Sequence, residues 1–328
     1  MWLTGILLAG LLAGGIAVLW AACLAEDARP AGIRRCRACG DHLPVAALLT
    51  PWRGRCGACG AFASRGLLVG AVCTGVLFAG LAWGLEQGCQ SVTEVRPADP
   101  VWQGRLPFQL LLMFFLVAAV VSDLIDYVIP DQIVLPGVVA AVFLAFVSGD
   151  LQMMHIWVDW SDELVQVYGP YLPQWMKDHQ HLHGLAWSLA GCVLGAGLVW
   201  LARIAANLIL GFPAIGFGDV TLMAMIGAFM GWQPVLCVLA VSPIVGIVLG
   251  FSVYVVTGRG FMAFGPCLAV GAVVVLFGWR AIWEQQGLRI IFGHWPTMAG
   301  LIMGSFSVYC ILLAGVRIFR STPASRLR

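Results

Sequence analysis

Three carboxylates stand at the edges of strongly apolar segments, where an ionisable side chain is unusual. Asp123 ends the run "QLLLMFFLVAAVVSD", and Asp126 lies three positions later. Asp219 stands near the start of a second run, "GFGDVTLMAMIGAFMG", after Gly216 and Gly218. An ionisable group inside a membrane span costs roughly 2.5–3.5 kcal/mol even on lenient insertion scales, so its presence points first to function. These acids are therefore the first candidates for chemistry.

Two carboxylates that lie close together in a low-dielectric site do not both ionise readily, so one keeps a proton while the other stays charged. Such a pair holds and activates water. The charged acid takes a proton from the water, and the protonated acid gives one to the carbonyl oxygen of a peptide. Glycines before Asp219 would let a substrate backbone approach that acid closely. The pattern predicts peptide hydrolysis by Asp123 and Asp219 without a covalent intermediate.

Each of these signals also has a structural interpretation. In a chain with 40 glycines, a G-x-G-D string is equally typical of helix packing plus a cap. Asp126 lies about one helical turn after Asp123 on a similar face, and Pro130 is predicted to end that helix. Asp126 and Asp131 are also typical of interfacial acids just past a span, or of caps near Pro130. The combination of acids favours chemistry over either alternative.

The elements that must position these acids are membrane helices. Hydrophobic residues make up 61% of the chain and charged residues 10%, which lies outside the range of soluble globular domains. We expect an all-α polytopic membrane protein of about eight or nine transmembrane helices, because nine apolar runs approach the roughly 30 Å of a hydrocarbon core. The run at 219–232 is the weakest of the nine, which cover 2–24, 66–85, 106–123, 132–148, 184–210, 219–232, 234–256, 263–282 and 297–316.

Basic residues orient these helices. Seven arginines fall in the connection after the first run and four follow the last run, so both segments are predicted to face the cytoplasm. With nine spans, the acidic connections 86–105 and 149–183 then face outward. The ends of the third and fifth spans return to the cytoplasmic side, so Asp123 and Asp219 are expected at the same membrane level. The net charge of +2 does not indicate a nucleic-acid partner.

Four cysteines form two C-x-x-C knuckles in the first connection. Cys36 and Cys39 lie in "CRACG", and Cys56 and Cys59 lie in "CGACG". This spacing suits a closed, tetrahedral four-thiolate site for structural zinc. Disulfides and redox pairing are the alternative, and they are disfavoured in a reducing cytoplasm. The other seven cysteines lie in or beside apolar runs, where they act as small hydrophobes.

These motifs together resemble the type IV prepilin peptidases, a family of membrane aspartic proteases of the G-x-G-D kind. "SDLIDYVIPDQIVLP" is similar to the family's first active-site segment, with Asp123 seven positions before Pro130. "GFGDVTLMAMIGAFMGW" is similar to its second, with Asp219 as the other acid. "FGPCLAVGA", at 264–272, is similar to a further signature, and the paired knuckles are similar to the family's cytoplasmic insertion.

The resemblance implies an enzyme that cleaves the leader of type IV prepilins, or of the pseudopilins of type II secretion, at the cytoplasmic face of the bacterial inner membrane. Family members use an intramembrane helical fold, and substrate enters from the bilayer. The rival interpretation is a transporter or a proton or ion channel that uses intramembrane aspartates. The implied organisation is a first transmembrane helix at 1–24, a zinc-binding domain at 25–65, a peptidase domain at 66–320 and a cytoplasmic tail at 321–328.

Many members of the family also N-methylate the new N-terminus with S-adenosylmethionine. This chain departs from the family in the regions associated with methylation: the first span reads "GGIAVLWAACLAED" in place of a Gly-Ser-Phe-x-Asn string, and "ASRGLLVGAV" after the knuckles lacks the expected acid. S-adenosylmethionine is therefore implied only if methyl transfer is retained. Thr221 also stands where a Lys commonly follows the catalytic Asp.

Overall fold

The protein is described by a computed structural model at residues 2–28, 58–60, 65–92, 95, 101–157, 173–258 and 263–321. These residues form α-helices, with no strand beyond an isolated bridge between Val92 and Val95. The predicted all-α class is confirmed. The helices are α1 (Trp2–Ala28), α3 (Arg65–Glu86), α4 (Val101–Asp126), α5 (Asp131–Ser148), α7 (Gln174–Asp178), α8 (Gln180–Leu210), α9 (Phe217–Met230), α10 (Trp232–Thr257), α11 (Gly265–Trp283), α12 (Gln286–Gly293) and α13 (Trp295–Ser321).

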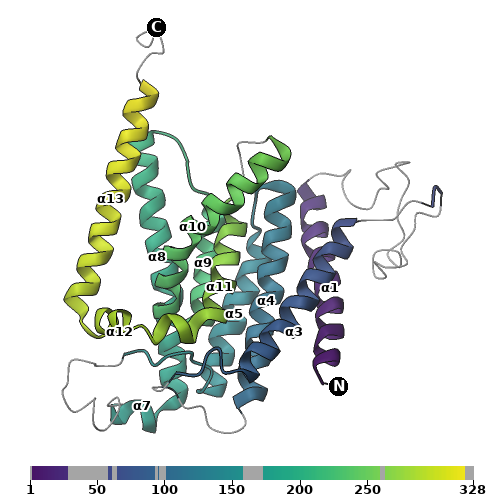
Figure 1. Ribbon diagram of the computed structural model, residues 1–328, viewed down its shortest axis with the longest axis vertical. Coiled ribbons are helices and arrows are strands. Elements are labelled where there is room, and N and C mark those ends of the chain that lie inside the picture. Colours follow the sequence, from purple (N-terminus) through teal and green to yellow (C-terminus); the bar gives the residue numbers. More distant parts are fainter. Residues whose placement is uncertain are drawn as a thin grey trace.

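Each of the nine apolar runs of the sequence corresponds to one of these helices. Eight of the helices in the described residues are long and apolar enough to cross a membrane, and α9 is the shorter exception. Its 14 residues rise about 21 Å, which is less than a hydrocarbon core of about 30 Å. The helices lie side by side in one bundle, with α9 among them (Figure 1). The chain is thus a multi-pass membrane protein.

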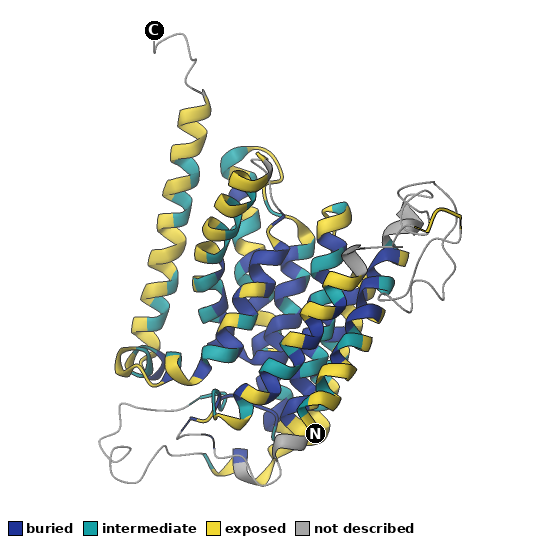
Figure 2. Ribbon diagram, turned by 45° about the vertical axis from the view of Figure 1, so that its right-hand side comes forward, coloured by how far each residue is buried: buried dark blue, intermediate teal, exposed yellow. Residues whose placement is uncertain are grey.

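Burial in the bundle is typical of a protein surrounded by lipid. Buried residues lie on the inward faces of the helices, and exposed ones lie on the outer surface (Figure 2). Much of that outer surface is apolar, because large hydrophobic side chains on α5, α10 and α13 are exposed. Helix α13 packs on α8 and stands at the edge of the bundle. Lipid acyl chains can cover such apolar faces, whereas water would not.

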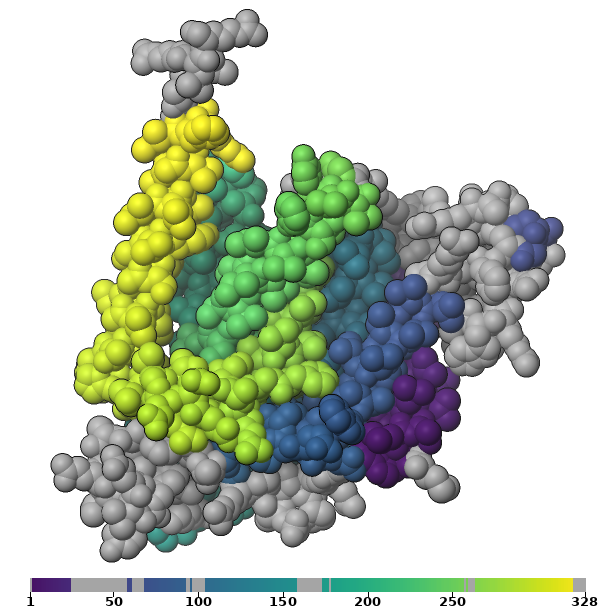
Figure 3. Space-filling view, in the orientation of Figure 1, coloured from purple at the N-terminus to yellow at the C-terminus, as the bar shows by residue number. Residues whose placement is uncertain are grey.

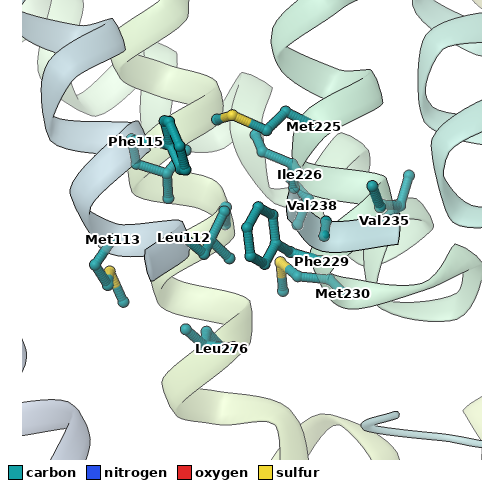
Figure 4. Close-up of a cluster of buried hydrophobic side chains, with 14 of the residues drawn as sticks. Leu112, Met113, Phe115, Met225, Ile226, Phe229, Met230, Val235, Val238 and Leu276 are labelled. Carbon is teal, nitrogen blue, oxygen red and sulfur yellow. The ribbon is translucent and has the colours of Figure 1, made fainter. Parts of the chain in front are cut away.

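The centre of the core is α9. From Val220 to Met230 only Thr221 and Ala224 are not fully buried, which matches a helix that is apolar all round. Phe229 of α9 packs against Phe108 of α4, with ring centroids 4.7 Å apart. Figure 4 shows the side chains of α9 meeting those of three neighbouring helices, namely Leu112, Met113 and Phe115 of α4, Val235 and Val238 of α10 and Leu276 of α11. A short helix can cross the bundle here because protein surrounds it.

Small residues bring α8 against α9. A Cβ added to Gly191 would overlap the carbonyl oxygen of Gly227, and one added to Gly195 would meet the carbonyl oxygen of Met223 at 2.5 Å. Such close backbone approach is the usual way in which membrane helices gain van der Waals contact, because lipid supplies no hydrophobic driving force between them. The tight crossing fixes the depth and rotation of α9, and hence of the acid in its first turn.

The described parts of the connections 86–105 and 149–183 lie at the same end of the bundle (Figure 1). Gln90 hydrogen-bonds to Gln109 and to the carbonyl oxygen of Leu276, and the Arg105 guanidinium donates to the carbonyl oxygen of Gln152 at 2.6 Å. Residues 151–154 of the long connection are buried. This part of the connection therefore packs onto the helix ends.

Candidate active site

The end of α4 differs from the sequence prediction. Pro130 does not end this helix: α4 ends at Asp126, and Pro130 is the N-cap residue of α5. The helix stops earlier because Tyr127 adopts a left-handed conformation with φ 56°, while its N–H still bonds to the carbonyl oxygen of Asp123. The Ser122 hydroxyl donates to the carbonyl oxygen of Val128 at 3.0 Å and holds the turn.

This turn brings Asp123 and Ile129 to the inner side of the bundle. Asp123 has 5% of its surface exposed, and the following turn folds back so that Ile129 is buried as well. Oδ2 of Asp123 is buried and accepts no hydrogen bond from the described residues. A buried carboxylate oxygen normally has a donor, so this atom is placed to bind a group that comes from outside the chain.

Asp219 lies in the first turn of α9. Gly216 is the N-cap residue in extended conformation, and the Asp219 carboxyl reaches back to its backbone. This contact is part of the capping role that the glycine-rich string allows, and an acid in the first turn also interacts favourably with the helix dipole. Asp219 is nevertheless buried, with 9% of its surface exposed. Capping by itself does not require burial.

The structure brings the two acids together. Asp123 and Asp219 lie close enough to interact electrostatically, although they are 96 positions apart in the sequence. Ile129 is their shared neighbour: a Cβ on Gly218 would lie 3.0 Å from the Ile129 side chain. The charges of both acids also reach Cys267 near the start of α11. Both carboxyls are thus buried beside the same apolar side chain.

One residue of this site, Gly265, was not predicted from the sequence. A Cβ on Gly265 would overlap Oδ2 of Asp123 and would come within 3.1 Å of Ile129. The Gly265 backbone also contacts the Asp123 carboxyl. The motif "FGPCLAVGA" contains this glycine, and a Gly-Pro pair before an apolar run at the predicted cytoplasmic end was the signal available. It gave no indication of which side chain the glycine would meet.

The other predicted site residues are Gly216, Gly218, Asp126, Asp131 and the four knuckle cysteines. Gly216 and Gly218 lie beside Asp219 and Ile129, as described above. Asp126 is half-buried at the last position of α4, and Asp131 is exposed in the first turn of α5. Of the four knuckle cysteines, Cys59 lies in an exposed turn, whereas Cys36, Cys39 and Cys56 lie outside the described residues. The zinc site remains a prediction.

The chain is similar to known proteins over the segment that carries both acids. A model described as the type IV leader peptidase family matches residues 110–251, which include Asp123 and Asp219. A prepilin leader peptidase/N-methyltransferase of Aeromonas salmonicida (strain A449) is 29% identical over 192 residues, 57% of this chain and 54% of that protein. Proteins of the same name from Pseudomonas putida (28% over 261 residues, 74% and 72%) and Neisseria gonorrhoeae (24% over 244 residues, 74% and 68%) are also similar.

These matches confirm the resemblance to type IV prepilin peptidases that the motifs indicate. The chain spans about half the length of the first of these relatives, 54%, and about three quarters of the length of others. No solved structure gave a significant match to the chain.

Proposed function

We propose that this chain, whose residues 110–251 belong to the type IV leader peptidase family, is a membrane aspartic endopeptidase that removes the leader of type IV prepilins or type II secretion pseudopilins. The observation that supports this most strongly is the buried pair of Asp123 and Asp219. The relatives carry peptidase names, which favours hydrolysis over transport or ion conduction by the same acids.

In the proposed reaction the two carboxyls share one proton before catalysis. The ionised acid takes a proton from a water molecule while the oxygen of that water attacks the scissile carbonyl carbon. The protonated acid gives its proton to the carbonyl oxygen. The acid that was protonated at the start then takes that proton back as the tetrahedral intermediate breaks its C–N bond. The acid that took a proton from water gives this proton to the leaving amine. The pair ends with one proton, as it began, and forms no covalent intermediate.

The glycines have a defined part in this proposal. Gly216 leaves the backbone beside Asp219 without a side chain, so a peptide main chain could approach that acid closely. Gly218 and Gly265 instead make room for Ile129 and for the Asp123 carboxyl. Oδ2 of Asp123, which has no donor among the described residues, is the natural position for the water or for the peptide carbonyl. Pro130 supports the site by starting α5 at the end of the turn that holds Ile129.

We also propose that the chain resides in the bacterial inner membrane with the acids near the cytoplasmic face. The arginine-rich connection at 29–65 and the basic residues after 316 support this orientation. The ends of α4 and α8 and the start of α9 lie at the end of the bundle where α13 also finishes, as shared cytoplasmic placement requires (Figure 1).

The function is tested by mass spectrometry of a type IV prepilin co-expressed with this chain. We expect loss of the leader on the N-terminal side of the prepilin's hydrophobic segment. The same spectrum reports whether the new N-terminus gains a methyl group, and S-adenosylmethionine is a cosubstrate only if it does. A panel of type IV prepilins and type II pseudopilins that all keep their leaders would contradict the proposal.

The cysteine knuckles are proposed to bind one structural zinc ion through Cys36, Cys39, Cys56 and Cys59. Replacing Cys36 and Cys39 together with Ser is expected to reduce bound zinc from about one equivalent to near zero and to lower the thermal stability of the purified protein. Elemental analysis measures the zinc. Replacement of Cys73, an exposed cysteine of α3, serves as the control. Unchanged zinc in the double variant would refute the site.

A further inference from the structure

One apolar side chain, Ile129, touches the starts of the two helices that lie beside the acids. It belongs to the turn between α4 and α5 and is 5% exposed. A Cβ added to Gly218, in the first turn of α9, would meet the Ile129 Cβ at 3.0 Å. A Cβ added to Gly265, the first residue of α11, would meet the Ile129 Cδ1 at 3.1 Å. The two ends of one side chain therefore lie against two different helices.

Each of these two glycines is next to one of the acids. Gly218 directly precedes Asp219 in the sequence. Gly265 lies so close to Asp123 that an added Cβ would overlap Oδ2 of this acid. Because neither glycine has a side chain, their backbones can approach Ile129 more closely than those of other residues. The position of each acid thus depends on how its neighbouring glycine lies against Ile129.

The turn that carries Ile129 is fixed by its own backbone. Tyr127 adopts a left-handed conformation with φ 56°, which a residue with a side chain keeps only where its surroundings impose it. The Ser122 hydroxyl donates to the carbonyl oxygen of Val128, directly before Ile129. Pro130, directly after it, has a φ restricted by its ring and is the N-cap residue of α5. The turn therefore holds Ile129 at a set place relative to the end of α4.

Helices α9 and α11 are braced on the sides that face away from Ile129. On α9, Gly227 follows Gly218 by nine residues, about 180° round the helix, and it is pressed against the backbone of α8. On α11, Cys267 lies about 200° round from Gly265, and it contacts α10. Figure 3 shows α10 and α11 side by side over the centre of the bundle. With α8 and α10 on their far sides, the two helix starts are kept apart by the side chain between them.

We propose that Ile129 is a positioning residue, a spacer between the starts of α9 and α11 that sets the separation of the Asp123 and Asp219 carboxyls. This inference rests on the proposed function, in which the two acids must lie close together to share a proton. Ile129 has no polar side-chain atom, so it takes no part in proton transfer, and its burial keeps it away from the substrate. It acts on the reaction through the geometry of the acids alone.

The test shortens the spacer in two steps. Ile129→Val removes Cδ1, the atom that lies against Gly265, and keeps the Cβ that lies against Gly218. Ile129→Ala removes every side-chain atom beyond Cβ. Displacing a catalytic group by about 1 Å can cost about 10²-fold in rate, so we expect kcat for prepilin cleavage to fall about tenfold in Ile129→Val and about 10²-fold in Ile129→Ala. KM should stay essentially unchanged, because Ile129 does not contact the substrate.

A conservative variant, Ile129→Leu, tests whether the reach of the side chain is what matters. Leu has the same number of atoms as Ile and can return a terminal methyl group to the space beside Gly265. Exchanges that conserve volume are also the best tolerated in a packed interior. We therefore expect the kcat of Ile129→Leu to lie between those of Ile129→Val and the wild type.

The matched control is Ile133, which lies about one turn further along, in α5. It is the same residue type, is fully buried and belongs to the same apolar core. Ile133→Ala and Ile129→Ala both remove buried apolar atoms, so both should lower the melting temperature. Only Ile129→Ala should also lower the kcat of the folded protein. This difference separates positioning of the acids from a general loss of core packing.

The outcomes separate this inference from the proposed function. A wild-type kcat in Ile129→Val and Ile129→Ala would overturn the role of Ile129, and so would equal losses of kcat in Ile129→Ala and Ile133→Ala. A higher KM with unchanged kcat would do the same, because it would place Ile129 in substrate binding. If Ile129→Ala does not fold, the comparison of Ile129→Val with Ile133→Val decides. Failure of the wild-type protein to cleave any prepilin would overturn the proposed function instead.

Discussion

Replacing Asp219 with Asn is expected to abolish leader removal while the protein remains folded and inserted. Asn has nearly the same shape and keeps an oxygen that can accept from the Gly216 backbone, but it can neither hold a negative charge nor share a proton with Asp123. Loss of a general acid or base costs roughly 10²–10⁴-fold in rate, and loss of water activation by the pair removes the remaining route. The rate of prepilin cleavage in detergent or vesicles measures the effect.

The matched control for this variant is Asp131→Asn. Asp131 is exposed in the first turn of α5, so we expect its replacement to leave cleavage within about threefold of the wild type, as for surface substitutions generally. The melting temperatures of both variants should match that of the wild type. Cleavage by Asp219→Asn at a wild-type rate would remove Asp219 from the mechanism.

Gly265→Val is expected to have the second largest effect. Even the first side-chain carbon would overlap Oδ2 of Asp123, and it would press on Ile129 at 3.1 Å. The Asp123 carboxyl must then move away from Asp219, or α11 must shift at its first residue. Overpacking costs about 1–3 kcal/mol in stability, and displacing a catalytic group by about 1 Å can cost 10²-fold in rate. We expect cleavage to fall at least that far.

Gly250→Ala provides the comparison for Gly265→Val. Gly250 lies in α10, where an added Cβ meets nothing within 4 Å, so this change should leave both stability and cleavage essentially unaltered. Parallel measurements of melting temperature and kcat separate a displaced carboxyl from general unfolding. A Gly265→Val protein with wild-type kcat would show that the contact of Gly265 with Asp123 has no role in positioning the acid.

The helices could be predicted from the sequence because each is a long apolar run whose length is set by the membrane. Helix α9 was the weakest prediction for the same reason, since its 14 residues are short for a span. It can lie inside the bundle because protein surrounds it. Gly191 and Gly195 of α8 lie in close contact with its backbone. That packing depends on a long-range match between two helices, and no local pattern reveals it.

The pairing of Asp123 with Asp219 could be predicted because topology alone brings the ends of the third and fifth spans to one face. The contact of Gly265 with Asp123 could not be predicted, because it depends on the close approach of a third segment, the start of α11. The end of α4 was also predicted wrongly: Pro130 was the obvious helix breaker, but Tyr127 turns the chain first through a left-handed conformation that its residue type does not favour.

The central claim is that Asp123 and Asp219 together hydrolyse a peptide bond, and reconstitution tests it most directly. Vesicles that contain only this protein and a type IV prepilin should yield leader and shortened prepilin by mass spectrometry. The double variant Asp123→Asn/Asp219→Asn, at equal amount and with an equal melting temperature, should yield neither product. Leader release by the double variant, or intact prepilin with the wild-type protein, would contradict the account.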